Sequence, residues 1–179
     1  WMEKEIGVDY PWQNYKQVPV HDFLYAGMEN TSCTIFSDAF MIDDSAFIDK
    51  NYVNVNAHEL AHQWFGDLVT ETSGKHHWLQ EGFATYYALL AEREVFGDNY
   101  YYWKLFEYME ELAAQDRIGE STALLNPKSS STTFYKKGAW VLVMLREKVG
   151  DQAFKTAVRR YLMKHAFGNV ETTDFIEEV

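Results

Sequence analysis

The sequence is short of several features that would point to particular protein classes. It has one cysteine, Cys33, so it can form neither an internal disulfide nor a metal site built from cysteines. It has no signal peptide, no lipidation motif and no apolar run long enough to span a bilayer. Sixteen Lys and Arg stand against 27 Asp and Glu, a net charge of −11. This argues against nucleic-acid binding, because that affinity depends on neutralising phosphates.

The sequence does have enough apolar material for one substantial domain. Hydrophobic residues make up 47% of its 179 positions and aromatic residues 17%, so a packed core needs no disulfide or metal staple. The chain starts at Trp1 without an initiator methionine and stops at Val179 inside a predicted helix. We therefore expect one domain over 1–179 that is a piece of a longer protein.

The periodicity of the apolar residues divides the chain into two parts. The first fifty residues lack helical periodicity and are predicted as strands and loops, with a strand at Cys33–Phe36. From Asn51 the apolar residues recur at three- and four-residue spacing, which predicts a mainly helical part over 51–179. Helices are predicted over 54–65, 79–96, 100–117, 134–149 and 151–165, and a last one opens at 172–174.

Two histidines in the first predicted helix have the spacing of a metal site. His58 and His62 flank Glu59 in the sequence His-Glu-Leu-Ala-His. Four residues along a helix amount to about 400° of rotation and about 6 Å of rise, so both imidazoles leave one face and can share an ion. Glu59 lies about 100° around the helix, where it can take a proton from a bound water. The alternative is two histidines that cover a helix face without a metal.

A catalytic zinc site needs a third protein ligand and an open position. Glu81 can supply the ligand, because 18 residues separate it from His62, enough for a loop and the entry into a second helix. The alternative is a carboxylate that only complements the dipole of that helix. His76 and His77 lie in the same loop. They are predicted to be a solvent-exposed pair, since three ligands already fill the site.

Four motifs in the same order resemble those of one family. The HExxH sequence, 18 intervening residues and a glutamate followed by Gly-Phe-Ala are similar to the gluzincin aminopeptidases of the aminopeptidase N family, which includes leukotriene hydrolase. Three further stretches resemble other signatures of this family, namely Ala61–Thr70, Ala26–Asn30 and Tyr135–Ala139. The resemblance extends from about Val20 to Leu145.

The resemblance implies one zinc ion held by His58, His62 and Glu81. It implies that Glu59 is the general base, which deprotonates the attacking water and delivers the proton to the leaving amine. It also implies that the phenol of Tyr135 stabilises the oxyanion of the tetrahedral intermediate. From periodicity alone Tyr135 is a core or rim aromatic, and only the match to the family signature gives it a catalytic role.

The motif before the first long helix implies how the substrate is held. Glu29 would pair with the α-ammonium group of a peptide. The backbone around it would align the peptide by strand-like pairing, and this segment comprises Ala26, Gly27, Met28 and Asn30. Ala26 departs from the family, which usually has glycine there, so the shape of a substrate subsite can differ. The alternative for Glu29 is a charged residue at a strand edge.

The resemblance also implies the fold and the surroundings of this chain. We expect an α+β, thermolysin-like metallopeptidase catalytic domain, with a small, mostly antiparallel sheet from 1–50 and a mainly helical lobe from 51–179. The active site would lie between them. In the full-length protein a β-rich domain would precede this piece and a helical domain would follow it. The expected substrates are peptides with a free N-terminus.

Three other functions stay open. A zinc endopeptidase would keep the metal site but have no use for Glu29. Some family members add an epoxide hydrolase activity, which the catalytic core alone does not exclude. A catalytically silent binding module is the third, although such modules usually lose a ligand or the base, and this chain keeps them all. The sequence indicates no particular compartment.

Overall fold

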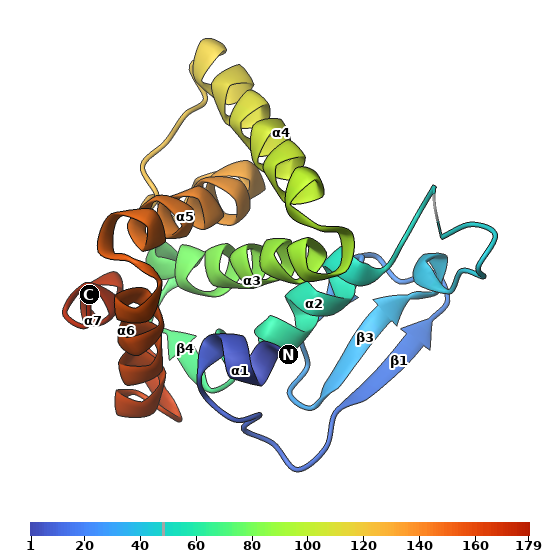
Figure 1. Ribbon diagram of the computed structural model, residues 1–179, viewed down its shortest axis with the longest axis horizontal. Coiled ribbons are helices and arrows are strands. Elements are labelled where there is room, and N and C mark those ends of the chain that lie inside the picture. The colour runs from blue at the N-terminus through green and yellow to red at the C-terminus, as the bar shows by residue number, and fades with distance from the viewer. Residues whose placement is uncertain (48) are drawn as a thin grey trace.

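The computed structural model describes residues 1–47 and 49–179, and the strands of its N-terminal part lie to one side of a larger group of helices (Figure 1). In chain order, the helical elements are α1 (Met2–Ile6), η1 (Asp38–Phe40), α2 (Val53–Ala61), η2 (Gly74–His76), α3 (Trp78–Phe96), α4 (Asp98–Arg117), the π-helical turn η3 (Thr133–Lys137), α5 (Gly138–Val149), α6 (Asp151–Lys164) and α7 (Thr172–Ile176). The strands are β1 (Lys16–Val20), β2 (Gly27–Met28), β3 (Cys33–Ser37), β4 (Val69–Glu71) and β5 (Gly168–Val170).

The N-terminal part forms a three-stranded sheet in the order β1–β3–β2. β3 pairs antiparallel with β2 but parallel with β1, with Lys16 opposite Cys33 and Val20 opposite Ser37. The expectation of a mostly antiparallel sheet is therefore wrong for the longer pairing. The chain reverses between β1 and β2 and again before β3. These two reversals make β3 run in the same direction as β1, and its place between the two earlier strands lets it pair with both.

This sheet is only partly covered. Thr34 and Phe36 of β3 are buried and alternate with more accessible neighbours, as expected of a strand with one covered face. β1 is exposed along most of its length. It contains Pro19, which an edge strand tolerates because one row of its N–H groups has no ladder partner. The strand part therefore contributes little to the core.

α3 is the central helix of the larger part. Residues on all its sides are buried, including Phe83, Ala84, Tyr87 and Leu89. A helix that is apolar all round has to be covered on every side, and α2, α4 and α5 all pack against it (Figure 1). The predicted α+β architecture, a small sheet followed by a helical lobe, is confirmed.

α3 and α5 cross where each helix has a glycine. A Cβ added to Gly82 would lie 3.0 Å from the Cα of Gly138, and one added to Gly138 would lie 2.9 Å from the Cα of Gly82. A larger residue at either position would push the two helices apart. Glu81 precedes one of these glycines and Tyr135 lies three residues before the other. The crossing therefore sets how closely those two side chains approach.

Several helix limits differ from the prediction. α2 ends at Ala61 instead of Phe65, because the backbone turns after His62 and the Gly66 N–H donates a hydrogen bond to the Val69 carbonyl (2.9 Å). The helix predicted over 134–149 begins as the π-helical turn η3 and becomes α-helical at Gly138.

Two short features escape the sequence analysis. α1 is a helix within the first fifty residues, which were expected to hold only strands and loops. Its buried Met2 and Ile6 explain why it forms, since they anchor it to the core, where it packs against α6. β4 and β5 form a parallel pair between residues almost a hundred positions apart, and three-residue strands are too short to show alternation. Within the described ranges, no helix combines the length and the apolar character needed to cross a membrane.

Candidate metal centre

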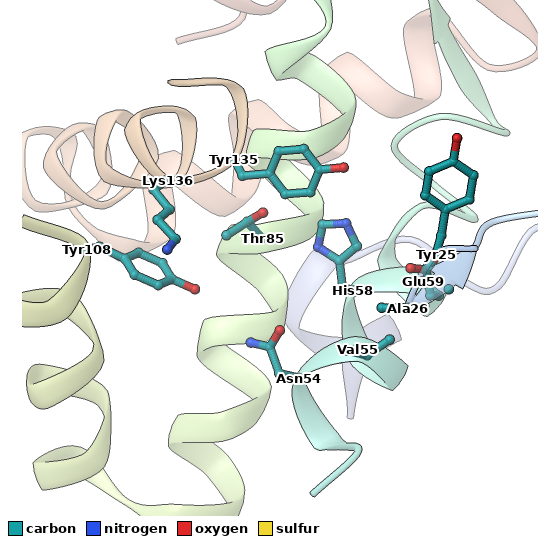
Figure 2. A pocket seen from close by; sticks show the side chains of 11 residues that line it. Tyr25, Ala26, Asn54, Val55, His58, Glu59, Thr85, Tyr108, Tyr135 and Lys136 are labelled. Atoms are coloured by element: carbon teal, nitrogen blue, oxygen red, sulfur yellow. The ribbon is translucent and has the colours of Figure 1, made fainter. Parts of the chain in front are cut away.

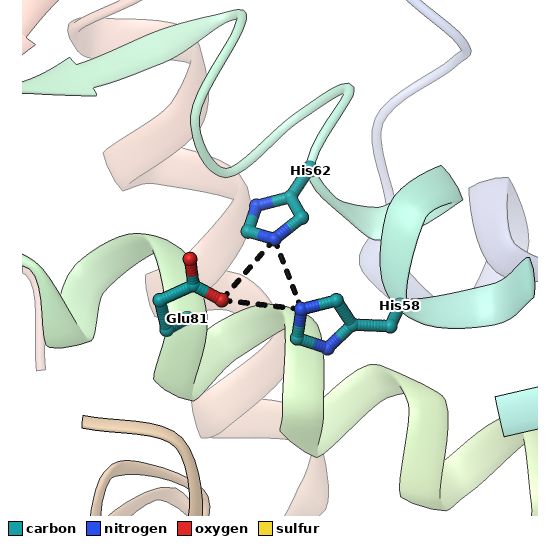
Figure 3. Close-up of side chains that lie close together, drawn as sticks. All are labelled: His58, His62 and Glu81. Carbon is teal, nitrogen blue, oxygen red and sulfur yellow. Dashed lines mark hydrogen bonds and ion pairs between the residues drawn. The ribbon is translucent and has the colours of Figure 1, made fainter. Parts of the chain in front are cut away.

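Three side chains from two neighbouring helices converge on one point. His58 lies on α2, His62 directly follows α2, and Glu81 lies in the first turn of α3. The Nε2 of His58 lies 3.1 Å from the Nε2 of His62 and 3.1 Å from the Oε2 of Glu81. The third side, between His62 Nε2 and Glu81 Oε2, measures 3.4 Å. Figure 3 shows this triangle of donor atoms.

The triangle has the dimensions of a zinc site. Ligand atoms at about 2.0 Å from a tetrahedral zinc stand about 3.3 Å apart. The three sides of 3.1 to 3.4 Å agree with that spacing. Two imidazole nitrogens and a carboxylate oxygen are a set that catalytic zinc uses, with a further position left for water. The residues fit the metal expected from the sequence, and their role as its ligands stays a prediction.

A backbone carbonyl determines which nitrogen of His62 faces the centre of the triangle. The Nδ1 of His62 lies 3.0 Å from the carbonyl oxygen of Phe65. Because a carbonyl only accepts, Nδ1–H donates, and Nε2 keeps its lone pair for a metal. The turn that ends α2 early is what brings the Phe65 carbonyl to the ring.

The charges in the triangle favour a cation. Burial alone would raise the pKa of Glu81, but hydrogen bonds and charges from His58 and His62 outweigh it and hold this pKa well below the usual range. Burial likewise acts to lower the pKa of His62, but the Glu81 carboxylate outweighs it and raises the pKa to about 9. The ionised carboxylate therefore attracts positive charge to this point, as protons or as a metal.

Glu59 lies on α2 beside the triangle with one oxygen free. It is buried, and within the described part of the chain its Oε2 has no hydrogen-bond partner. A Cβ added at Gly27 would overlap the Glu59 carboxylate, so only glycine lets β2 come this close. Burial raises the pKa of Glu59 to about 7. A carboxyl group with that pKa can take up and release a proton near neutrality.

Tyr135 lies against the first ligand. Its ring stacks on that of His58, with centroids 5.5 Å apart and an angle of 4° between the planes. Burial, followed by the negative charge of Glu81, raises the pKa of the phenol above its usual value, so the hydroxyl stays protonated and can donate. It lies in the π-helical turn η3, a kind of irregularity that is frequent at functional sites.

A cavity of about 330 Å³ opens beside these groups. Figure 2 shows Thr85 of α3 and Tyr135 to one side of His58, and Glu59 beside Ala26 to the other side. Among the described residues, the Oγ1 of Thr85 is buried without a hydrogen-bond partner. The cavity therefore joins the candidate base, the candidate phenol donor and a histidine of the triangle in one concave space.

The predicted substrate-binding segment lies on the side of the cavity that carries Glu59. Ala26 and Gly27 line the cavity, whereas Met28 and Asn30 are exposed and lie outside its lining. Glu29 is half-buried, and its carboxylate lies within 4.8 Å of ligand atoms of both Glu59 and His62. The structure thus places Glu29 beside the candidate metal centre, and its role in substrate binding stays a prediction.

Gln63 holds this segment against the end of α2, a role that was not predicted from the sequence. Its side chain is inaccessible to solvent. Its Nε2–H donates to the carbonyl of Glu29 (3.3 Å), and its Oε1 accepts the backbone N–H of Ser32 (2.7 Å). The available signal was an amide directly after His62 and before two aromatic residues, where a polar side chain needs buried partners.

The expectation for His76 and His77 is wrong. His76 is buried, and its Nδ1 accepts the backbone N–H of Thr172 (3.1 Å). His77 is only partly exposed and lies between two carboxylates, Glu71 and Glu81. The His76 contact could not be read from the loop sequence, because the fold brings Thr172 to it from far along the chain. The partners of His77 are close in sequence, but the irregular loop has no periodicity from which these contacts could be predicted.

Comparisons of sequence relate the chain to known peptidases. All of residues 1–179 match the family model described as "Peptidase family M1 domain". The chain is 33% identical over 184 residues to endoplasmic reticulum aminopeptidase 1 of Homo sapiens, an alignment that covers 96% of this chain and 20% of the relative. It is 32% identical to aminopeptidase N of Lactobacillus delbrueckii subsp. lactis, over 92% of this chain and 21% of that protein. The chain thus spans about a fifth of the length of these relatives.

Comparisons of structure give the same relationship. Yeast LTA4 hydrolase in complex with bestatin superimposes with a TM-score of 0.84 and 28% identity, over 99% of this chain and 30% of that one. An M1 zinc metallopeptidase from Deinococcus radiodurans gives a TM-score of 0.82 and 28% identity, over 99% of this chain and 38% of that one. The fold is that of these metallopeptidase domains, and the metal named for the second is the zinc expected from the sequence.

Proposed function

The chain belongs to peptidase family M1, and from that premise we propose that the protein is a zinc aminopeptidase whose catalytic part is formed by residues 1–179. The observation that carries this proposal is the placement of Glu29 and Glu59 beside the triangle of His58, His62 and Glu81. A metal site, a base and an acceptor for a substrate ammonium group thus lie within one small volume. Because the relatives are about five times longer, flanking domains complete the full-length protein.

His58, His62 and Glu81 hold the zinc. When bound, zinc polarises the scissile carbonyl and makes water a stronger nucleophile at neutral pH. The protein contributes a rigid frame, because the two histidines come from one helical segment and Glu81 from the helix packed beside it. The Phe65 carbonyl keeps the His62 ring in the tautomer that presents Nε2.

Glu59 moves the proton. Its free Oε2 accepts a proton from the attacking water as the water oxygen bonds to the carbonyl carbon. As the carbon–nitrogen bond breaks, Glu59 returns that proton to the amine nitrogen, which leaves as the new N-terminus. Tyr135, stacked on His58, donates a hydrogen bond from its hydroxyl to the carbonyl oxygen as negative charge develops there.

Glu29 makes the reaction an exopeptidase reaction. Its carboxylate pairs with the α-ammonium group of the substrate, and its closeness to Glu59 places the first peptide bond at the base. Ala26 and Gly27 line the cavity on the same side and align the substrate backbone, in continuation of β2. An endopeptidase substrate has no charged terminus to pair with Glu29, which would leave a half-buried carboxylate unpaired. A mutant of the Deinococcus radiodurans metallopeptidase was solved with the peptide substrate Tyr-Ser-Ala.

The test uses the full-length protein. Its metal content is measured first, and then turnover is compared between aminoacyl amides with free and with acetylated N-termini. We expect about one zinc per chain and hydrolysis of the free substrates only. Equal hydrolysis of the acetylated substrates would indicate an endopeptidase. Bound zinc without hydrolysis of either would indicate a silent binding module.

A further inference from the structure

Glu81 has a second carboxylate oxygen, and it faces a histidine that is not part of the triangle. Its Oε2 lies against His58 and His62, whereas its Oε1 lies 3.5 Å from the Nε2 of His77. The Nδ1 of the same ring lies 3.1 and 3.3 Å from the two carboxylate oxygens of Glu71. The three side chains form a continuous row, Glu71–His77–Glu81, that leads away from the triangle.

We propose that Glu71 and His77 are positioning residues that hold the Glu81 carboxylate in its metal-binding orientation. This inference rests on the proposed role of Glu81 as a zinc ligand. A carboxylate group can rotate about its side chain and present either oxygen to a metal. A contact that holds one oxygen therefore determines that the other oxygen binds the metal. Contacts of this kind around a metal site commonly change metal affinity by 10- to 100-fold when they are removed.

The His77 ring is placed to connect both carboxylates. Carboxylate oxygens only accept, so His77 makes both contacts as an imidazolium with two N–H groups: Nδ1–H donates a hydrogen bond to Glu71, and Nε2–H faces Glu81 at the distance of an ion pair. The edge of the ring is also packed against Phe134, with centroids 5.2 Å apart and planes at 82°. Phe134 directly precedes Tyr135, so the packing that holds His77 in place also ties it to the turn that carries the phenol.

Glu71 is itself held by regular structure. It is the last residue of β4, which pairs with β5, and its backbone N–H donates to the Oε1 of Gln80 (3.2 Å). Its side chain is largely covered. The row therefore begins at Glu71 in a paired strand and ends at Glu81 in the first turn of α3, so regular secondary structure holds both of its ends. Such support is what a ligand needs to keep its geometry to within a fraction of an ångström.

His76 provides a matched comparison. It is the same residue type one position earlier, but it turns away from the triangle and bonds to Thr172 near the C-terminus of the chain. Its loss would disturb the packing between η2 and α7 and leave the Glu81 carboxylate untouched. Comparing substitutions of His77 and His76 thus distinguishes a change in the orientation of the Glu81 carboxylate from a general loss of stability.

The experiment measures the zinc dissociation constant of the full-length protein by competition with a chelator, together with the melting temperature of the metal-free form. His77→Leu removes both contacts and should raise the dissociation constant about 10- to 100-fold. Glu71→Met should raise it by less, because the His77 contact to Glu81 remains. The double variant should be no weaker than His77→Leu, since Glu71 acts through His77. His76→Gln should lower the melting temperature and leave zinc affinity in the folded protein within about twofold, because the His76 side chain contacts Thr172 and not Glu81.

Several outcomes would overturn the proposal. An unchanged dissociation constant in His77→Leu is one, and an equal weakening in His76→Gln is another, because it would make the effect one of packing. If His77→Leu does not fold, Glu71→Met carries the test, and unchanged zinc affinity in that variant overturns the proposal. His62→Ala in the same assay isolates the underlying assignment. If it binds zinc like the parent protein, the proposed ligands are wrong. If His62→Ala loses zinc but His77→Leu binds zinc as tightly as the parent protein, the ligand assignment holds and only the positioning role of Glu71 and His77 is wrong.

Discussion

The α2–α3 region and the strand region meet at one site but differ in how well they are covered. His62, Gln63 and Glu81 are all buried in the helical part. In the strand part, Leu24 is 83% exposed and Tyr25, at the edge of the cavity, is 61% exposed. The metal side of the site is therefore enclosed by the described residues, whereas the substrate side is largely open in this chain.

The two tasks of the site thus make different structural demands. Metal ligands must keep a fixed spacing, which two packed helices and their hydrogen bonds supply locally. Recognition of a charged terminus needs water to be excluded around Glu29, because an exposed ion pair contributes little. We propose that the flanking domains of the full-length protein cover the strand side. Four substitutions test this division, beginning with the one that should cost the most activity.

Glu59→Gln should produce the largest loss, because it removes the base without removing a metal ligand. We expect turnover to fall by roughly 10²- to 10⁴-fold while the zinc content stays that of the parent protein. Steady-state kinetics and metal analysis of the full-length protein check both parts. Glu94→Gln, an exposed carboxylate near the end of α3, is the matched control and should change neither. Near-normal turnover in Glu59→Gln would show that the proposed mechanism is wrong.

Tyr135→Phe should have the next largest effect. Removing one donor to a developing oxyanion costs about 10²- to 10³-fold in turnover. Because the phenyl ring can keep its stacking on His58, zinc content and thermal stability should change little. The measurement is kcat together with the melting temperature. A loss of stability without a specific loss of kcat would return Tyr135 to a packing role.

Glu29→Ala tests the open side of the site by comparing two proteins. In the full-length protein a desolvated ammonium–carboxylate pair contributes about 1.5 to 3 kcal/mol, so kcat/KM should fall by roughly 10- to 150-fold. In a protein limited to residues 1–179, the same pair is partly solvated and contributes at most about 1 kcal/mol, a loss of about fivefold. Both are assayed on one fluorogenic aminoacyl substrate and on its acetylated form. Equal losses, with equal rejection of the acetylated substrate, would place the whole exopeptidase specificity within these residues.

Gln63→Met should have the smallest effect on chemistry. It leaves the Glu29 carbonyl and the Ser32 N–H without partners, which should lower the free energy of unfolding by about 1 to 3 kcal/mol. Because the loosened segment carries Glu29, we expect KM to rise several-fold with little change in kcat. Urea unfolding and kinetics on free N-termini measure the two effects. A loss of stability with unchanged KM would make Gln63 a purely structural residue.

Site features that depend on regular local geometry could be predicted from the sequence, and features that depend on contacts without such a pattern could not. The shared face of His58 and His62 follows from helical rotation alone. Glu81, Tyr135 and Glu29 depended on family motifs, because the contacts that bring them together cross the fold. The Glu71–His77 pair had no motif to indicate it, although its two residues are close in sequence, because the irregular segment between β4 and α3 has no periodicity from which a contact could be predicted.

The errors in the fold have the same origin. The parallel pairing of β1 with β3 is decided by which gap the later strand enters, and the alternation of apolar residues carries no information on that choice. The early end of α2 is decided by the turn that brings the Phe65 carbonyl to His62, a constraint that overrides helical periodicity. In both cases a non-local or site-specific contact outweighs the local pattern.

The most direct test of the proposed metal centre is the position of the metal in a crystal of the full-length protein, located by anomalous diffraction at the zinc edge. We predict one zinc peak, at about 2.0 to 2.2 Å from the Nε2 atoms of His58 and His62 and from the Oε2 of Glu81. Glu29, Glu59 and His62 form a second group whose donor atoms lie within 4.8 Å of one another. A zinc peak within that second group, with His58 and Glu81 unbound, would contradict both the ligand assignment and the roles proposed for Glu59 and Glu29.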